Sequence, residues 1–357
     1  MPIALFREMK IRDLTIPNRA WVSPMCQYSA KDGLIGEWHR IHLGAFATGG
    51  AGLIFVEATG VVPEGRISVG CPGIWNDDLA QAFKPIVDFA HSMGSKIGIQ
   101  LAHAGRKGST MVPWSDHLLA TEEDGGWQTV SASSIPFTGM QVPHMLSTDE
   151  IASLVEHFGE AATRAVGVGF DVVEIHAAHG YLLHQFLSPL TNQRTDEYGG
   201  SIQGRMRFLL EVAQRVRNAI PEGTPLFVRI SATDWVEGGW DIDQSVMLAA
   251  ELKKLGVDLI DVSSGGLVPN AVIPVGPGYQ VPFANEIREK AQIPTSAVGV
   301  ITDAHQAEEI ITSGKADAVM LAREMLRNPR WALAASEELG QRAMWPKQFT
   351  RATKIPH

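Results

Sequence analysis

GFDVVEIHAAHGY, residues 169–181, joins the end of a helix to a buried strand and a polar loop. Apolar residues recur at helical spacing in the preceding segment 151–158, and Gly169 marks where that helix should end. The apolar run from Asp171 to His176 is rich in β-branched residues, which predicts a strand of a parallel sheet. The stretch therefore has the order of helix, strand and loop that one unit of an α/β fold requires.

The same alternation of short apolar runs and longer amphipathic stretches extends along the chain from about Arg19. Repeated units of roughly 30 residues favour a closed barrel, because a doubly wound sheet usually has fewer units and a glycine-rich first turn. We therefore predict an α/β fold, a (β/α)₈ TIM barrel, as one domain over residues 1–357. The eight expected strands are Ala20 to Pro24, Gly52 to Ala58, Lys96 to Leu101, Asp171 to His176, Leu226 to Ser231, Asp258 to Ser263, Thr295 to Val298 and Ala316 to Leu321.

Residues that favour helix ends delimit the amphipathic stretches. Helix starts are expected at Ser147, Asp243 and Asp303, and helix ends at Gly94, Gly169, Gly256 and Gly314. Three segments lie outside the repeat: a hairpin over Leu5 to Ile16 that closes the far end of the barrel, a lid insertion over residues 104–145, and a tail over residues 340–357. The tail has no clear periodicity, so we expect it to pack on another surface.

Charge and cysteine content exclude several classes of function. The formal net charge of -9 argues against nucleic acid as a partner, and no uncharged stretch is long enough to span a membrane. The charged N-terminus does not resemble a secretory signal, and the two cysteines, Cys26 and Cys71, are too few and too far apart for a disulfide framework or a zinc site. We expect a cytoplasmic protein with a small-molecule substrate.

The loops after the strands of a TIM barrel carry its active site, so polar residues there are the candidates. The segment HAAHGY places His176, His179 and Tyr181 after the fourth expected strand. One interpretation is a metal site, which His39 and His42 favour by repeating the spacing, although no matching carboxylate cluster accompanies them. The other is a pair of N–H donors that hold a carbonyl or nitro oxygen, with Tyr181 supplying a proton.

A second set of residues indicates a site that binds the phosphate group of a ligand. The loops after the last two strands of such barrels commonly bind phosphate, and here they contain Gly299, Ala322 and Arg323. Arg229, at the end of the fifth expected strand, would place a fixed positive charge near the barrel axis, which suits an anionic reduced ring system. These positions favour a flavin over a sugar phosphate.

Taken together, the motifs resemble the Old Yellow Enzyme family of ene-reductases, and in particular its bacterial thermophilic-like subgroup with xenobiotic reductase-type members. The resemblance covers nearly the whole chain. The motifs that carry it are SPMCQY (23–28), PEGR (63–66), GIQLAHAGRK (98–107), EIHAAHGY (174–181) and SPLTNQRTDEYGGS (188–201).

The resemblance implies a flavin mononucleotide (FMN) that is bound tightly without a covalent bond. Gln100 would meet its pyrimidine edge, Cys26 would tune its potential, and Arg323 would meet its phosphate. His176 and His179 would hold the substrate, beside Tyr28, and Tyr181 would donate the proton. The implied cofactor contacts are Ser23, Pro24, Met25, Cys26, Gly60, Gln100, Arg229, Gly299, Ala322 and Arg323.

The resemblance also implies a catalytic cycle and an oligomer. NAD(P)H would reduce the flavin, which then transfers hydride to the β-carbon of an enone, a maleimide or a nitroalkene. Arg351, in the C-terminal tail, would enter the neighbouring subunit's site in a homodimer or homotetramer. The chain departs from the family pattern at Gly60, where alanine is frequent, at Ala322, where glycine is frequent, and at Gly204, where asparagine is usual.

Two other functions remain as alternatives. A metal-dependent barrel hydrolase would use the two histidine pairs and would be purified as a colourless, metal-containing protein. A non-catalytic barrel would bind flavin without turning over NAD(P)H, but such a site has no need of Tyr181 beside two oxyanion donors.

Overall fold

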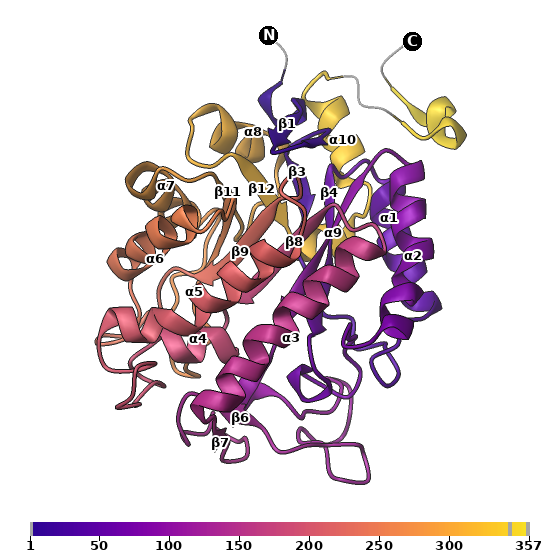
Figure 1. The fold of residues 1–357 in the computed structure, drawn as a ribbon. Coiled ribbons are helices and arrows are strands. Elements are labelled where there is room, and N and C mark those ends of the chain that lie inside the picture. Colours follow the sequence, from indigo (N-terminus) through magenta and orange to yellow (C-terminus); the bar gives the residue numbers. More distant parts are fainter. Residues whose placement is uncertain (1–2, 342–344, 355–357) are drawn as a thin grey trace.

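The structure is a computed structural model that describes residues 3–341 and 345–354. Eight parallel strands form a closed barrel, and each strand pairs with its neighbours along the chain until β12 returns to β3 (Figure 1). This is the predicted (β/α)₈ TIM barrel. The barrel strands are β3 (Ala20–Val22), β4 (Leu53–Gly60), β5 (Lys96–Ala102), β8 (Val172–Ala177), β9 (Leu226–Ser231), β10 (Leu259–Ser263), β11 (Thr295–Ala297) and β12 (Ala318–Leu321).

Helices follow the strands and cover the outside of the barrel (Figure 1). Two of them, α4 (Leu182–Leu187) and α9 (Arg323–Arg327), are short additions between a strand and its covering helix. The covering helices are α1 (Glu37–Thr48), α2 (Asp77–Ser92), α3 (Thr148–Gly167), α5 (Ile202–Ala219), α6 (Ile242–Lys254), α7 (Val281–Ala291), α8 (Ala304–Thr312) and α10 (Trp331–Glu338).

The helix ends follow local chemistry. Ser147 and Asp303 cap α3 and α8, as predicted, since each side chain accepts a backbone N–H three residues ahead. The predicted cap at Asp243 is wrong: Asp241 caps α6 by accepting the N–H of Gln244, and Asp243 lies in the first turn. The four glycines expected at helix ends all have positive φ, a conformation that glycine adopts without steric cost.

The core has two layers, because successive strand residues face opposite sides. One layer lies between the strands and the helices and is mostly aliphatic. The other fills the hairpin end of the barrel interior with large side chains, among them Trp21, Phe55 and Phe227, and the Trp21 and Phe227 rings stack at 5.9 Å. Met9, Ile11 and Ile16 of the hairpin β1 (Met9–Ile11) and β2 (Leu14–Ile16) join this second layer. The hairpin therefore closes one end of the barrel, as predicted.

The remaining segments lie at opposite ends of the molecule. The long segment after β5 has no α-helix before α3; it contains η3 (Gly105–Lys107) and a two-stranded sheet of β6 (Val130–Ser131) and β7 (His144–Met145). This sheet extends beyond the end of the barrel opposite the hairpin (Figure 1). In the tail, η4 (Lys347–Ala352) lies near α10 at the hairpin end, where the Arg330 guanidinium lies 4.3 Å from the Phe349 ring centroid. No helix within the described ranges is long and apolar enough to cross a membrane.

Candidate active site

The carboxyl ends of the strands enclose a buried polar group of side chains. Strand pairing sets Gln100 beside Glu174 and Asp261 beside both Arg229 and Ser296. Gln100 Nε2 donates to Glu174 Oε1 at 2.8 Å, and Arg229 Nε lies 2.9 Å from Asp261 Oδ2. Ser296 Oγ donates to the other oxygen of Asp261 at 2.9 Å. Arg229 therefore has a buried counterion, and the predicted pair Gln100 and Arg229 lies in one network.

One carboxyl group of this network holds a proton. Burial raises the pKa of Glu174 well above its ordinary value, and the nearby Asp261 carboxylate raises it further. Burial also raises the pKa of Asp261, but the Arg229 guanidinium and the hydrogen bond from Ser296 both lower it, so Asp261 is the carboxyl group of the pair that loses its proton first. Glu174 Oε2 is buried and has no hydrogen-bond partner among the described residues, so it can donate to a bound molecule.

The two histidines and the tyrosine of HAAHGY converge above this network. The ring centroids of His176 and His179 lie 5.2 Å apart, and those of His176 and Tyr181 lie 5.1 Å apart. His179 has a φ of +59°, and its backbone N–H donates to Ser231 Oγ at 2.9 Å, which holds the left-handed turn. The structure thus brings these three predicted residues together.

Electrostatics keep both imidazoles neutral. Burial, followed by the positive charge of Arg229, holds the pKa of His176 and that of His179 well below the ordinary value. A neutral imidazole has one N–H donor and one acceptor nitrogen. His179 Nε2 lies 2.7 Å from Ser263 Oγ, whereas His176 Nδ1 is buried without a hydrogen-bond partner in the described chain. These ring nitrogens are suited to an oxygen atom of a ligand.

Lys107 contacts the same group, although no role was predicted for it from its motif. Its ammonium donates to the backbone oxygens of His179 at 2.8 Å and Gly266 at 2.9 Å, and it lies 5.0 Å from the Tyr181 ring centroid. Burial lowers the pKa of Lys107 to about 8. Burial also raises the pKa of Tyr181 well above its ordinary value, so the phenol keeps its proton. Lys107 therefore holds the histidine loop and places a positive charge beside the phenol.

A cavity of about 340 Å³ opens beside Arg229 and Ser263. Four predicted cofactor residues line it, namely Arg229, Gly299, Ala322 and Arg323. Gly299 has a φ of +122°, and a Cβ there would lie 2.9 Å from the Gln280 side chain, so the cavity wall requires glycine at this position. Ala322 lines the same cavity, at the residue before α9, with a negative φ of -107° that does not require glycine.

The residues of this cavity fit a flavin mononucleotide. The Arg323 guanidinium and the backbone N–H groups at the start of α9 suit a phosphate, since the first N–H groups of a helix have no partner within it. Arg229 provides a second positive charge in the cavity lining, and it pairs in the sheet with His176 of the histidine pair. The two arginines match the anionic phosphate and the polar ring of such a molecule.

The predicted cofactor residues of the loop after β3 are not among the described residues that line this cavity. Ser23 donates its backbone N–H to the Leu321 oxygen at 2.9 Å, and its buried Oγ has no hydrogen-bond partner among the residues described. Pro24 and Met25 are half-buried. Cys26, Tyr28 and Tyr181 pack on a small cluster at the ends of β4 and β5: Ala58, Ile67, Cys71, Ala102 and Ala104. Gly60 ends β4, and its N–H donates to the Pro72 oxygen at 2.9 Å.

Arg351 does not join these residues within one chain. It is exposed on η4, at the hairpin end of the barrel, opposite the end where β6 and β7 lie (Figure 1). The structure of a single chain therefore assigns it no contact with the cavity.

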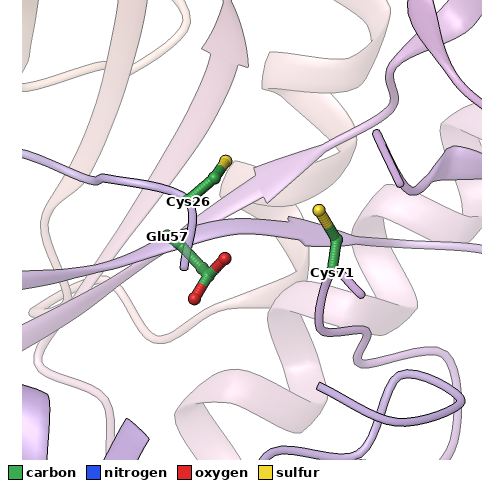
Figure 2. A group of neighbouring side chains, drawn as sticks. All are labelled: Cys26, Glu57 and Cys71. Carbon is green, nitrogen blue, oxygen red and sulfur yellow. The ribbon is translucent and has the colours of Figure 1, made fainter. Parts of the chain in front are cut away.

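The second histidine pair has other contacts. His39 Nδ1 accepts the Gly36 N–H at 3.2 Å, and its Nε2 lies 3.3 Å from Glu57 Oε1. His42 contacts the rings of Trp38 and Phe46. Instead, the group of possible metal ligands found in the described ranges consists of Cys26, Glu57 and Cys71, whose ligand atoms all lie within 4.8 Å of one another (Figure 2). Spacing along the chain did not predict that the two cysteines meet.

Comparisons with known proteins identify the family of the chain. The sequence profile of the NADH:flavin oxidoreductase / NADH oxidase family matches residues 4–341. The chain is 49% identical over 358 residues to the NADPH dehydrogenase of Geobacillus thermodenitrificans (strain NG80-2), a match that covers 99% of this chain and 100% of that protein. The NADPH dehydrogenase of Listeria monocytogenes serotype 4a (strain HCC23) is 47% identical over 353 residues, covering 98% of this chain and 99% of that one.

Solved structures give the same result. Morphinone reductase superposes with a TM-score of 0.79 at 30% sequence identity, covering 97% of this chain and 92% of that one. The Old Yellow Enzyme homologue from Zymomonas mobilis has a TM-score of 0.77 at 28% identity, covering 99% and 97%. The chain is therefore an oxidoreductase that belongs to the NADH:flavin oxidoreductase / NADH oxidase family, as its resemblance to the Old Yellow Enzyme family implied.

Proposed function

We propose that the enzyme binds FMN without a covalent bond and reduces alkenes activated by a carbonyl or nitro group at the expense of NAD(P)H. The observation that carries the proposal is the convergence of two neutral histidines and a protonated tyrosine beside a cavity that Arg229 and Arg323 line. The names of the relatives, NADPH dehydrogenase and morphinone reductase, support a nicotinamide reductant and a small organic substrate.

The histidines hold the substrate oxygen. Neutral His176 and His179 can each turn one N–H toward a carbonyl or nitro oxygen and stabilise the negative charge that develops there. Ser263 competes for His179 Nε2 and fixes the orientation of the ring until substrate arrives. When bound, FMN would supply the hydride chemistry that connects NAD(P)H to the β-carbon of the alkene.

Tyr181 supplies the proton. Its phenol is protonated over the ordinary pH range, because burial raises its pKa, and it lies beside His176. The Lys107 ammonium near its ring stabilises the phenolate that remains after transfer. Tyr28 packs on the same small cluster as Tyr181, which supports its predicted place in the substrate pocket.

The cofactor assignment is tested by the colour of the purified protein. We expect a yellow protein whose flavin is released by denaturation as free FMN; a colourless protein that added FMN does not restore would refute the assignment. His176→Ala and His179→Ala should weaken phenol and enone binding by about ten- to a hundredfold, the loss of a hydrogen bond to a developing charge, while the flavin stays bound. Loss of flavin with unchanged substrate affinity would contradict the substrate role.

Two segments complete the proposal. Residues 104–145 act as a lid, because this segment supplies Lys107 and extends past the end of the barrel that holds the site. The tail brings Arg351 to the site of a second copy, because its position on η4 leaves it exposed and far from the end of its own barrel where the site lies. The enzyme works in the cytoplasm, a reducing compartment that suits its two free cysteines.

Subunit mixing tests the shared site. Arg351→Ala and His176→Ala should each lower the rate of alkene reduction. When the two variants are co-expressed, about half of the dimers are mixed by random pairing, and one of the two sites in each mixed dimer has both His176 and Arg351. Activity should therefore return in about a quarter of the sites. Mixed dimers without restored activity, or full activity in Arg351→Ala alone, would refute the role of the tail. Arg330→Ala provides a matched control, since it removes the arginine that contacts Phe349 in the same tail.

A further inference from the structure

Cys26 and Cys71 come together from different loops. Cys26 lies in the loop after β3 and Cys71 in the loop after β4, and both sulfur atoms lie within 4.8 Å of each other and of a Glu57 oxygen. Figure 2 shows the two thiols projecting on the same side of β4, while the Glu57 carboxylate points away from them. These are the only cysteines in the 357 residues, so no other thiol of the chain competes for either of them.

The Glu57 carboxylate is already engaged, which argues against a metal at this position. Its Oε2 accepts the Gln27 backbone N–H at 2.8 Å, and its Oε1 lies 3.3 Å from His39 Nε2. Two sulfurs alone fall short of the four ligands that zinc usually takes in a structural site. The two thiols are thus free to react with each other.

The pair has the chemistry that disulfide formation requires. The neighbouring Cys26 side chain lowers the pKa of the Cys71 thiol, whereas Cys71 and burial raise the pKa of Cys26 well above its ordinary value, so Cys71 is the thiol of the pair that loses its proton first. Ser68 Oγ lies 3.6 Å from the Cys71 sulfur. The thiolate is the reactive form of cysteine. Cys26 is half-buried and Cys71 fully buried, so an oxidant reaches Cys26 first and Cys71 is placed to attack the oxidised sulfur.

We propose that Cys26 and Cys71 form a redox-active pair that a peroxide converts to an intramolecular disulfide. The Cys26 sulfur attacks one peroxide oxygen and the O–O bond breaks. Cys71, the thiol of lower pKa, acts as the base that passes the Cys26 proton to the leaving oxygen, so water departs and Cys26 becomes a sulfenic acid. The Cys71 sulfur then attacks that sulfur and expels a second water as the S–S bond forms. In total two thiols and one hydrogen peroxide give one disulfide and two waters, so sulfur is oxidised and oxygen is reduced.

The disulfide would act on the proposed active site. Cys71 lies in the cluster on which Cys26, Tyr28 and Tyr181 pack, so a covalent bond between the two loops changes the wall beside the proton donor. This consequence rests on the proposed function, whereas the formation of the disulfide does not.

Intact-mass measurement tests the pair. Purified holoenzyme is treated with one equivalent of hydrogen peroxide and then denatured in N-ethylmaleimide. We expect the mass of the protein to fall by two hydrogens and no maleimide to be added. The digest should contain a linked Cys26–Cys71 peptide. Reduction with dithiothreitol should make both cysteines available to maleimide again. Because the readout is a mass, a protein that failed to bind flavin would still give this result.

Cys71→Ser and Cys26→Ser are matched controls. Cys71→Ser should trap a sulfenic acid on Cys26 that dimedone labels, with no loss of two hydrogens, and Cys26→Ser should keep one alkylatable thiol. Wild-type protein that keeps two alkylatable thiols, or gains oxygen without forming the linked peptide, would overturn the proposal. So would one equivalent of tightly bound zinc that shields both thiols from peroxide, since that result identifies a metal site. If a variant fails to fold, the wild-type digest alone decides.

Discussion

Replacing Glu174 with glutamine should stabilise the protein at neutral pH, although it alters a fully buried residue. Glu174 Oε1 accepts a hydrogen bond from Gln100, and an amide oxygen can accept the same bond. Because burial and Asp261 raise its pKa, the native side chain is a neutral acid of nearly the same size and shape as glutamine. At pH 5 the substitution should therefore change the free energy of unfolding by less than about 1 kcal/mol.

The difference should then grow with pH. In the unfolded chain a glutamate loses its proton near pH 4.3, as an approximate reference value, whereas Glu174 keeps its proton in the fold to a higher pH. Within that window the folded state binds one proton more, so the stability of the wild type falls as pH rises, by about 1.4 kcal/mol per pH unit. Glutamine does not titrate. Between pH 5 and pH 7 the variant should gain about 3 kcal/mol on the wild type if Glu174 stays protonated throughout.

Urea unfolding followed by circular dichroism measures this difference, at pH 5, 6 and 7 with saturating FMN. Glu309→Gln, at an exposed glutamate of α8, controls for the loss of one carboxylate. If the free energy of unfolding changes with pH in the same way for the wild type and for Glu174→Gln, Glu174 is ionised in the folded protein. The charge assignment of the whole network around Arg229 would then be wrong.

Three further substitutions separate the cavity from the scaffold. Gly299→Ala should cost about 1–3 kcal/mol of stability and weaken FMN binding, because its Cβ would lie 2.9 Å from the Gln280 side chain at a positive φ. Unchanged FMN affinity in a fluorescence titration would count against the cavity as the cofactor site. Trp21→Ala should cost about 3–5 kcal/mol in urea unfolding and leave the flavin absorbance unchanged, since Trp21 fills the hairpin end of the barrel. Asp261→Ala leaves the buried Arg229 charge without its carboxylate partner and should lower the free energy of unfolding by about 3–5 kcal/mol. A change in melting temperature of about one degree or less would contradict this prediction.

The sequence predicted the barrel well because its signals are local and repeated. Each strand is a short apolar run that glycine or a polar cap separates from a helix, so eight such units determine the architecture even where bounds differ by a residue or two. The incorrect cap at Asp243 shows the limit of this reasoning. Two aspartates precede the same apolar run, and only Asp241 has the geometry to accept the N–H of Gln244.

Site residues at strand ends could be predicted for the same reason. His176, Arg229 and Gln100 lie in the second half of strands whose positions the repeat predicts, and closure of the barrel brings the carboxyl ends of these strands together. Contacts between loops could not be predicted, because they depend on how each loop folds after the barrel has closed. Lys107 and the meeting of Cys26 with Cys71 belong to this second kind: their partners lie far away in the sequence and no periodicity connects them.

Arg229 connects the two halves of the site. Its positive charge lowers the pKa of both histidines, after burial, and so keeps them as neutral donors. Two imidazolium ions at this distance would add two buried positive charges, which one ionised Asp261 could not balance. Since Asp261 loses its proton before Glu174, one carboxylate balances the Arg229 charge, and Lys107 places a further positive charge near the phenol. A fixed arginine that suits an anionic ring therefore also sets the protonation state in which the histidine pair can bind a substrate oxygen.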